Sequence, residues 1–216
     1  MKLRGDGASA GHCIIQLVVA LALLAAAGGC EPARPQLAHE AKLAEVYTVA
    51  VLHFVDAPGG LAKGSGEVVV SAAHSELIRC GIRVIERGRL KAIMGERDLR
   101  LAGLVDPTTA SEIGKLAGAE LVILGEITQY EAQKEYSHGA VYIVSGGKTR
   151  TIHRVGLSLR AVSVADGQVI YAEMGQGTSR EGYSPALKLA AKEAIRPLAL
   201  FFKERHEKAN APKPTQ

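Results

Sequence analysis

The sequence holds two short glycine-rich segments of the kind that can cradle phosphate groups. Residues 59–65 read GGLAKGS and lie between an apolar run and a helical pattern, where a phosphate-binding loop would lie. Such a loop needs Lys after its last Gly, but Ser65 stands there. Residues 147–149 read GKT, but Tyr142 replaces the first Gly of that motif. A nucleotide-binding enzyme therefore stays only as an alternative function without a complete motif.

Three other side chains belong to types that serve in metal or nucleophile sites. His74 and Cys80 are six residues apart, and a metal site needs a second pair of ligands that the sequence does not supply. The pair is more typical of a solvated histidine and a buried thiol. Ser71 shares a helix face with His74, but the sequence indicates no acidic partner. We therefore predict no metal site, no cofactor and no catalytic residue, and a chain that is not an enzyme.

One cysteine has neighbours that predict covalent lipidation. Lys2 and Arg4 precede the apolar run 14–27, IIQLVVALALLAAA. As a helix this run would reach only about 21 Å, short of the ~30 Å hydrocarbon core of a bilayer, so it predicts a secretory signal. Residues 27–30, AGGC, are similar to the bacterial lipobox, with Ala27 where Leu is preferred.

We therefore predict a lipoprotein signal peptide over residues 1–29, with Cys30 as the lipidated first residue of the mature chain. Acyl chains anchor a protein through about 0.8 kcal/mol per buried CH₂, so two or three chains hold firmly. Glu31 stands where Asp would signal retention in the inner membrane, which favours the periplasmic face of the outer membrane. An ordinary signal peptide, with Cys30 as a plain thiol, is the alternative.

The composition is that of a globular chain and excludes several function classes. The 216 residues are 47% hydrophobic and 22% charged, which is close to the usual balance of soluble domains. A net charge of +4 is too small for a nucleic-acid-binding face. Aromatic residues at 4%, with no Trp, argue against a sugar-binding groove or a base-stacking surface.

The remainder of the chain alternates strand and helix patterns. Residues 30–46, with two prolines among polar residues, predict a tether. Strands are predicted at 47–55, 82–85, 120–128, 153–164 and 168–173. Helices are predicted at 67–80, 87–97, 106–116 and from 184 onward. This order predicts an α/β fold: one layered periplasmic domain over residues 47–209, with a mixed β-sheet flanked by helices, and a disordered tail at 210–216.

The last predicted helix has two notable features. Its apolar face is expected to comprise Leu187, Leu189, Ala191, Ala194, Ile195 and Leu198. Pro197 lies inside the helix and is expected to kink or split it, because proline lacks the N–H that the helix needs.

Residues 84–128 carry the motifs of a known family. They read VIERGRLKAIMGERDLRLAGLVDPTTASEIGKLAGAELVILGEIT. The matching residues include Glu86, Arg87, Gly103, Leu104, Val105, Asp106, Gly118 and Gly125. With the strand VAVLHF at 49–54 and the lipobox, the sequence resembles the curli production assembly and transport family, the CsgG-like lipoproteins, over most of residues 47–200.

The resemblance implies an envelope role carried out through protein contacts. It implies a fold similar to the amino-terminal domain of TolB and to lipoprotein activators of cell-wall synthases. The expected function is non-catalytic support of envelope protein assembly, curli-like secretion or wall synthesis. The expected partners are the outer membrane, through acyl chains on Cys30, and periplasmic or outer-membrane proteins, with a homo-oligomer as a further option and no nucleic acid.

The motif residues also have structural explanations. Glu86 and Arg87 at a strand–helix junction suit a cap and a surface charge. Asp106 before a proline suits a helix N-cap, with its carboxylate accepting backbone N–H groups. Gly118 and Gly125 suit a turn or close packing.

The resemblance also implies a second candidate function, a subunit of an oligomeric outer-membrane secretion channel. A membrane-crossing strand hairpin needs about 20–24 residues. Residues 129–153 are just long enough, but Glu131, Gln133 and Glu135 occupy one face of that segment.

The second hairpin position offers only residues 172–184, which are too few to cross a membrane twice. We therefore expect the fold and the anchor of the family without its pore. Whether residues 129–153 enter a membrane stays open.

Overall fold

The structure, a computed structural model, describes residues 37–57, 62–95, 105–137 and 148–210. The chain divides into two compact units, Met1–Gln36 and Leu37–Gln216. The predicted signal peptide and Cys30 fall in the first unit, outside the described residues, and their assignment stays a prediction. The second unit is the folded domain.

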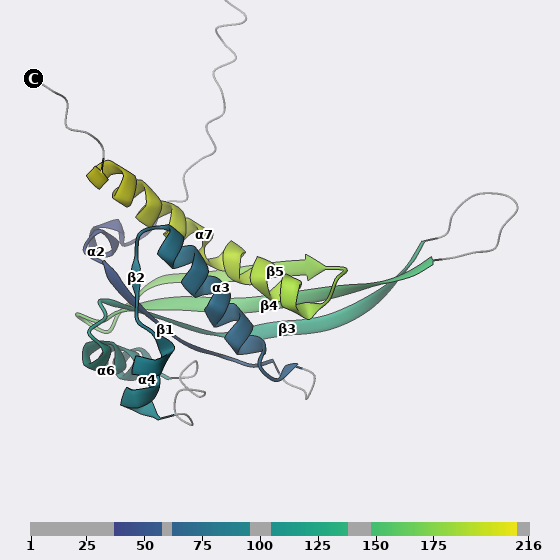
Figure 1. Cartoon of the computed structure of the whole chain (residues 1–216), viewed down its shortest axis with the longest axis horizontal. Coiled ribbons are helices and arrows are strands. Elements are labelled where there is room, and N and C mark those ends of the chain that lie inside the picture. Colours follow the sequence, from purple (N-terminus) through teal and green to yellow (C-terminus); the bar gives the residue numbers. More distant parts are fainter. Residues whose placement is uncertain (1–36, 58–61, 96–104, 138–147, 211–216) are drawn as a thin grey trace, which may run out of the picture. The chain divides into compact units, whose positions relative to one another are not determined.

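Five strands form one mixed sheet (Figure 1). They are β1 (Thr48–Val55), β2 (Arg83–Val84), β3 (Leu121–Ser137), β4 (Lys148–Ser163) and β5 (Val169–Ser179). Their order is β2-β1-β3-β4-β5. Strands β2 and β3 run parallel to β1. Strand β4 pairs in antiparallel fashion with β3 on one side and with β5 on the other. The β1–α3–β2 and β2–α4–α6–β3 connections supply the helices that crossovers between parallel strands require.

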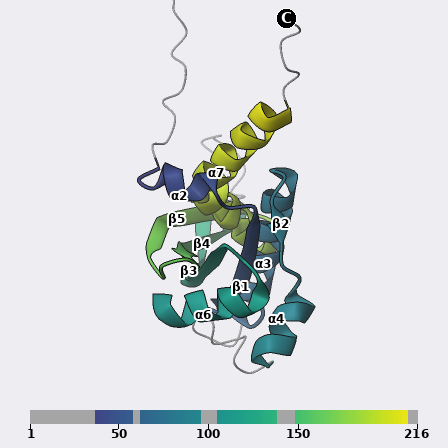
Figure 2. The same cartoon turned by 90° about the vertical axis from the view of Figure 1, so that its left-hand side faces the viewer.

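Helices pack on both faces of this sheet (Figure 2). On one face, α3 (Ser65–Arg79) and α7 (Tyr183–Asn210) bury Leu77 and Ile195 against Val51 and Ile123. On the other face, α4 (Arg87–Met94) and α6 (Pro107–Ala117) pack against β1, β3 and β4 in a second, smaller core. The predicted mixed sheet flanked by helices is confirmed.

The amino-terminal boundary differs from the sequence expectation. Helix α2 (Glu40–Ala44) lies within residues 30–46, which the sequence predicted as a tether. Leu43 is fully buried and Val46 is 4% exposed, both in the larger core. Residues 37–46 therefore pack on the domain, because the Leu43 and Val46 side chains lie in its core.

Strands β3 and β4 are longer than the predicted 120–128 and 153–164. They pair continuously in antiparallel fashion from Leu121–Ser163 to Ser137–Lys148, with one irregularity after Ile127. Strand β1 stops pairing with β3 at Glu126, and β5 stops pairing with β4 at His153. The residues beyond, 132–137 and 148–152, form a two-stranded extension that we call the arm (Figure 1).

Helix α7 continues through Pro197 without being split. The Tyr171 hydroxyl group of β5 donates a hydrogen bond to the Ala194 carbonyl oxygen. This bond joins β5 to α7 beside the proline. Leu189, expected on the apolar face, is 50% exposed. No helix in the described part of the chain combines the length and apolarity needed to span a bilayer.

Candidate interaction surface

The segment considered for phosphate binding has its helix amides occupied by the chain's own carboxylate. Residues 59–61 of that segment lie outside the described ranges. In the described part, the Asp56 carboxylate accepts hydrogen bonds from Gly64 N at 2.9 Å, Gly66 N at 2.7 Å and Ser65 Oγ at 3.2 Å. Burial alone would raise the pKa of Asp56, but these hydrogen bonds outweigh it and lower the pKa. The start of α3 thus already holds an anion.

The metal and nucleophile candidates are not assembled into a site. Ser71 Oγ donates to the Glu67 carbonyl oxygen at 2.9 Å. His74 is half-buried rather than solvated, and burial lowers its pKa. Cys80 is a buried free thiol whose pKa burial raises. The described ranges contain no group of three or more His, Cys, Asp or Glu residues placed to hold a metal ion.

The first family-motif residues lie around α4 and the segment before α6. Glu86 is exposed at the N-cap position of α4, but its side chain makes no capping hydrogen bond. Arg87 pairs with Glu67 of α3 at 2.9 Å. Val105 is half-buried, and its carbonyl oxygen accepts a hydrogen bond from Arg160 Nη2 at 2.9 Å. These contacts join α4 and the start of α6 to α3 and β4.

The remaining motif residues shape the backbone. Asp106 caps α6 by accepting from Thr108 N at 2.9 Å and Thr109 N at 3.1 Å, and these bonds together with the Thr109 hydroxyl group lower its pKa. Gly118 ends α6 with φ +72°, a conformation that favours glycine. A Cβ at Gly125 would lie 2.0 Å from the Ser158 carbonyl oxygen. Gly103 and Leu104 lie outside the described residues.

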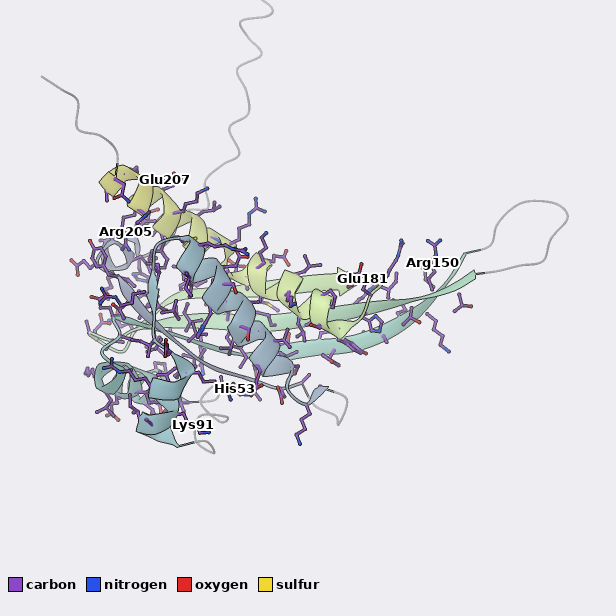
Figure 3. All side chains as sticks on the ribbon, in the orientation of Figure 1. His53, Lys91, Arg150, Glu181, Arg205 and Glu207 are labelled. Atoms are coloured by element: carbon purple, nitrogen blue, oxygen red, sulfur yellow. The ribbon has the colours of Figure 1, made fainter. Side chains whose placement is uncertain are left out.

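The arm offers a polar surface with charge on both faces. The face directed away from α7 carries Glu135 opposite Arg150 within the arm and Glu131 opposite Arg154 just before it, and all four side chains are exposed. Figure 3 shows Arg150 on this extension, beyond the helices. The opposite face carries exposed Lys134. Cross-strand pairs of opposite charge favour this strand register.

An aromatic cluster holds the root of the arm against α7. The Tyr130 and Tyr183 rings stack with centroids 3.8 Å apart, and the His153 ring meets Tyr183 edge-on at 4.6 Å. Burial, followed by the charges of Tyr183 and Asp56, raises the pKa of Tyr130. These three rings come from β3, β4 and α7, so the cluster fixes the direction in which the arm leaves the sheet.

Strand β5 is locked to α7 and its outer edge is partly blocked. A Cβ at Gly175 would lie 2.0 Å from the Ala190 carbonyl oxygen, and one at Gly177 would lie 1.9 Å from that of Ala186. At the edge, Gln176 N donates to the Glu193 carboxylate and Met174 N to the Glu173 carboxylate. Residues 172–184 are therefore a packed strand and turn rather than a hairpin.

A hollow of about 490 Å³ lies between α2 and the end of the sheet at Glu120 and Ser163. Lys42, Glu45, Glu120, Ser163, Asp166 and Ile170 are among the residues that line it. The Lys42 ammonium group lowers the pKa of Asp166 to about 2. The Glu120 carboxylate accepts a hydrogen bond from Thr48 N at 2.8 Å. Asp166 and Glu120 therefore already have partners within the chain.

Comparison with protein families gives one match that covers most of the chain. The family described as "Curli production assembly/transport component CsgG" matches residues 35–186. No curated protein sequence matches the chain significantly.

Several solved structures of bacterial lipoproteins and related proteins are similar in shape. A PelC dodecamer from Paraburkholderia phytofirmans has a TM-score of 0.46 and 19% identity, covering 71% of this chain and 88% of that one. Lipoprotein GNA1162 from Neisseria meningitidis has a TM-score of 0.42 and 15% identity, covering 63% and 81%. The LpoB C-terminal domain from Salmonella enterica has a TM-score of 0.38 and 13% identity, covering 62% and 82%. At these scores the likeness identifies neither a partner nor an assembly state for this chain.

Proposed function

We propose, because this chain belongs to the family of the curli production assembly/transport component CsgG, that it is a non-catalytic lipoprotein anchored at the periplasmic face of the outer membrane. It acts through protein contacts in envelope protein assembly, export or wall-synthase support. The observation that carries the proposal is the family match over residues 35–186, directly behind the lipobox-like residues 27–30.

The side-chain contacts support the absence of a reaction centre among the sequence candidates. Asp56 fills the anion position at the start of α3, and the Ser71 hydroxyl group bonds to its own helix. The family-motif residues with described positions cap helices, pair charges or allow close packing. These motif residues therefore build the framework of the domain, and the proposed function is assigned to the contacts that its surface makes.

The arm supports the choice of protein over lipid as the partner. Its described side chains place charges on both faces, and a single Lys or Arg facing lipid at the bilayer midplane costs about 2–4 kcal/mol. Protein interfaces accommodate such groups through hydrogen bonds, ion pairs and trapped water.

Replacing the predicted lipid acceptor tests the anchor. We expect Cys30→Ala to move the protein from the membrane fraction to the soluble periplasmic fraction, because the acyl chains supply the membrane affinity. Cys80→Ala is the matched control and should stay in the membrane fraction, since that thiol is buried in the domain. Retention of the Cys30→Ala protein in membranes after a high-salt wash would show that lipid anchoring is wrong.

The length of the arm favours one alternative, a subunit of an oligomeric secretion channel. Strands β3 and β4 supply one long hairpin. Residues 172–184, the second hairpin position, are instead held by the close approach of Gly175 and Gly177 to α7. Conductance steps across a planar bilayer, together with ring-shaped particles, would favour the channel over our proposal.

A further inference from the structure

Helix α2 is fastened to the domain from two sides. Lys42 Nζ reaches the turn between β4 and β5, where it pairs with the Asp166 carboxylate and donates to Gln168 Oε1 at 2.8 Å. Leu43 and Val46 fill the larger core between these polar contacts. Because both charge and apolar burial hold it, α2 moves with the domain.

The end of α2 is capped by a residue from the far end of the chain. Arg205 of α7 donates to the Leu43 carbonyl oxygen at 3.2 Å and to the Ala44 carbonyl oxygen at 2.9 Å. Its guanidinium group also lies 4.4 Å from the centroid of the Tyr47 ring. Figure 3 shows Arg205 and Glu207 on the part of α7 beside α2. This fastening makes α2 and the C-terminal part of α7 one end of the domain.

The docking of α2 leaves only six residues of sequence between Cys30 and the folded unit. Residues 31–36 read EPARPQ, and they alone separate Cys30 from Leu37, where the folded unit begins. Seven Cα–Cα steps span at most about 25 Å when fully extended. Without the docking of α2, the free segment would run to Thr48 and could span about 60 Å.

We infer that the α2 end of the domain is held within about 25 Å of the membrane that Cys30 enters. This inference rests on the proposed lipid anchor. Strand β4 is 16 residues long and spans about 50 Å, so the described part of the arm extends to roughly 75 Å from that membrane. The protein partner is therefore one that is embedded in this membrane, lies on it or comes within that distance of it.

The charges at this end favour a protein rather than anionic headgroups as the partner. Glu40, Glu45, Asp166 and Glu207 stand among Lys42 and Arg205, so both signs are present. A surface that binds anionic lipid presents clustered Lys and Arg residues instead. The α2 end therefore lies near the membrane because the tether holds it there.

Energy transfer on lipid vesicles tests the position of the α2 end. The full-length lipidated protein carries a donor dye at Lys208→Cys, one helical turn from Arg205, or at Arg150→Cys on the arm, and the vesicles carry an acceptor on their headgroups. We expect stronger transfer from position 208 than from position 150. Failure of the protein to sediment with vesicles would overturn both the anchor and this inference. Sedimentation with little or no transfer from position 208 would overturn this inference alone.

A change in tether length gives a second measurement on a folded domain. Inserting about twenty Gly/Ser residues between Gln36 and Leu37 raises the r.m.s. tether length from roughly 15 Å to roughly 29 Å. Transfer from position 208 should then fall, and unchanged transfer would contradict the inference.

Release of α2 from the domain should lower the energy transfer from position 208, as a longer tether does. Leu43→Ala removes the buried side chain that docks α2, so hydrogen exchange at residues 37–46 should accelerate and transfer from position 208 should fall. Leu189→Ala, the same change at a half-exposed site on α7, is the control and should change neither.

The location of the partner is tested in intact cells. A photo-cross-linker at position 150 should capture a protein of the membrane that holds the lipid anchor, or one that comes within roughly 75 Å of it. Capture of a protein that spans the opposite membrane would overturn the assignment of the partner.

Discussion

The Tyr171 hydroxyl group joins β5 to α7 beside Pro197. It donates a hydrogen bond to the Ala194 carbonyl oxygen, and its ring is buried in the larger core. Burial, with a smaller effect of Glu173, raises the pKa of this hydroxyl group far above its usual range, so it stays protonated and can donate.

We therefore expect Tyr171→Phe to destabilise the protein by about 0.5–1.5 kcal/mol, because it removes a buried hydrogen bond between β5 and α7. Thermal unfolding measures this as a fall in Tm of roughly 2–4 °C per kcal/mol for a chain of this size. Tyr47→Phe is the matched control, since Tyr47 is 62% exposed. Equal Tm values for the two variants would show that the hydroxyl group does not support the helix.

Asp56 makes the stability of α3 depend on pH. Its pKa is lowered in the folded protein, so it contributes stability above the unfolded pKa of about 3.9 and loses that contribution as pH falls through the folded value. We expect Asp56→Ala to cost about 0.5–2 kcal/mol at neutral pH, as the loss of a helix-capping acceptor does. Urea unfolding should show the gap between wild type and variant closing below about pH 4. A constant gap down to pH 2 would contradict this explanation.

At the scale of elements, the close packing of β5 on α7 depends on glycine. A Cβ at position 177 would stand 1.9 Å from the Ala186 carbonyl oxygen, so the helix must move to admit one. We expect Gly177→Ala to destabilise the protein by about 1–3 kcal/mol in chemical denaturation. Gly88→Ala is the control: nothing lies within 4 Å of its Cβ position in α4, so that change should raise stability by about 0.5–1 kcal/mol. If Gly177→Ala lowered the free energy of unfolding by less than an alanine substitution at an ordinary surface site does, tight packing at position 177 would be ruled out.

The elements that the sequence predicts well are those with local signals. Apolar runs fix β1 and the first half of β3, and Asp106 and Gly118 mark the two ends of α6. The second half of β3 is missed because neither of its faces is fully buried and so no alternation appears in its residues. Helix α2 is missed because it is five residues long and its contacts, Asp166 and Arg205, lie more than 120 residues away.

The candidate surface was predictable only in part. The charges of residues 129–153 argue against a lipid-facing hairpin without deciding the question, and the described part of the arm carries charged side chains on both faces. The stacking of Tyr130 on Tyr183 was not predictable, because a single tyrosine on each of two distant elements gives no pattern. The exposure of Leu189 shows the same limit. Helical spacing predicts which side of the helix is apolar, but tertiary packing decides how many residues on that side are buried.

At the scale of the whole domain, the family framework and the position of the domain have separate origins. The motif residues with described positions stabilise α4, α6 and β3 within the fold. In the lipid-anchored arrangement that we propose, the position relative to the membrane depends instead on Lys42, Leu43 and Arg205, which lie outside those motifs. Changes in the docking of α2 can therefore alter how far the domain extends from the membrane without altering the fold of the domain.

The carboxylates on the outer edge of β5 have a consequence for the lipid-anchored protein that we propose. Molecules confined to one leaflet collide often, and an exposed strand edge invites sheet-to-sheet aggregation. Glu193 and Glu173 occupy the backbone donors at positions 176 and 174, so these two donors cannot pair with a neighbouring strand. Crowded copies of the anchored protein are then less able to aggregate through β5.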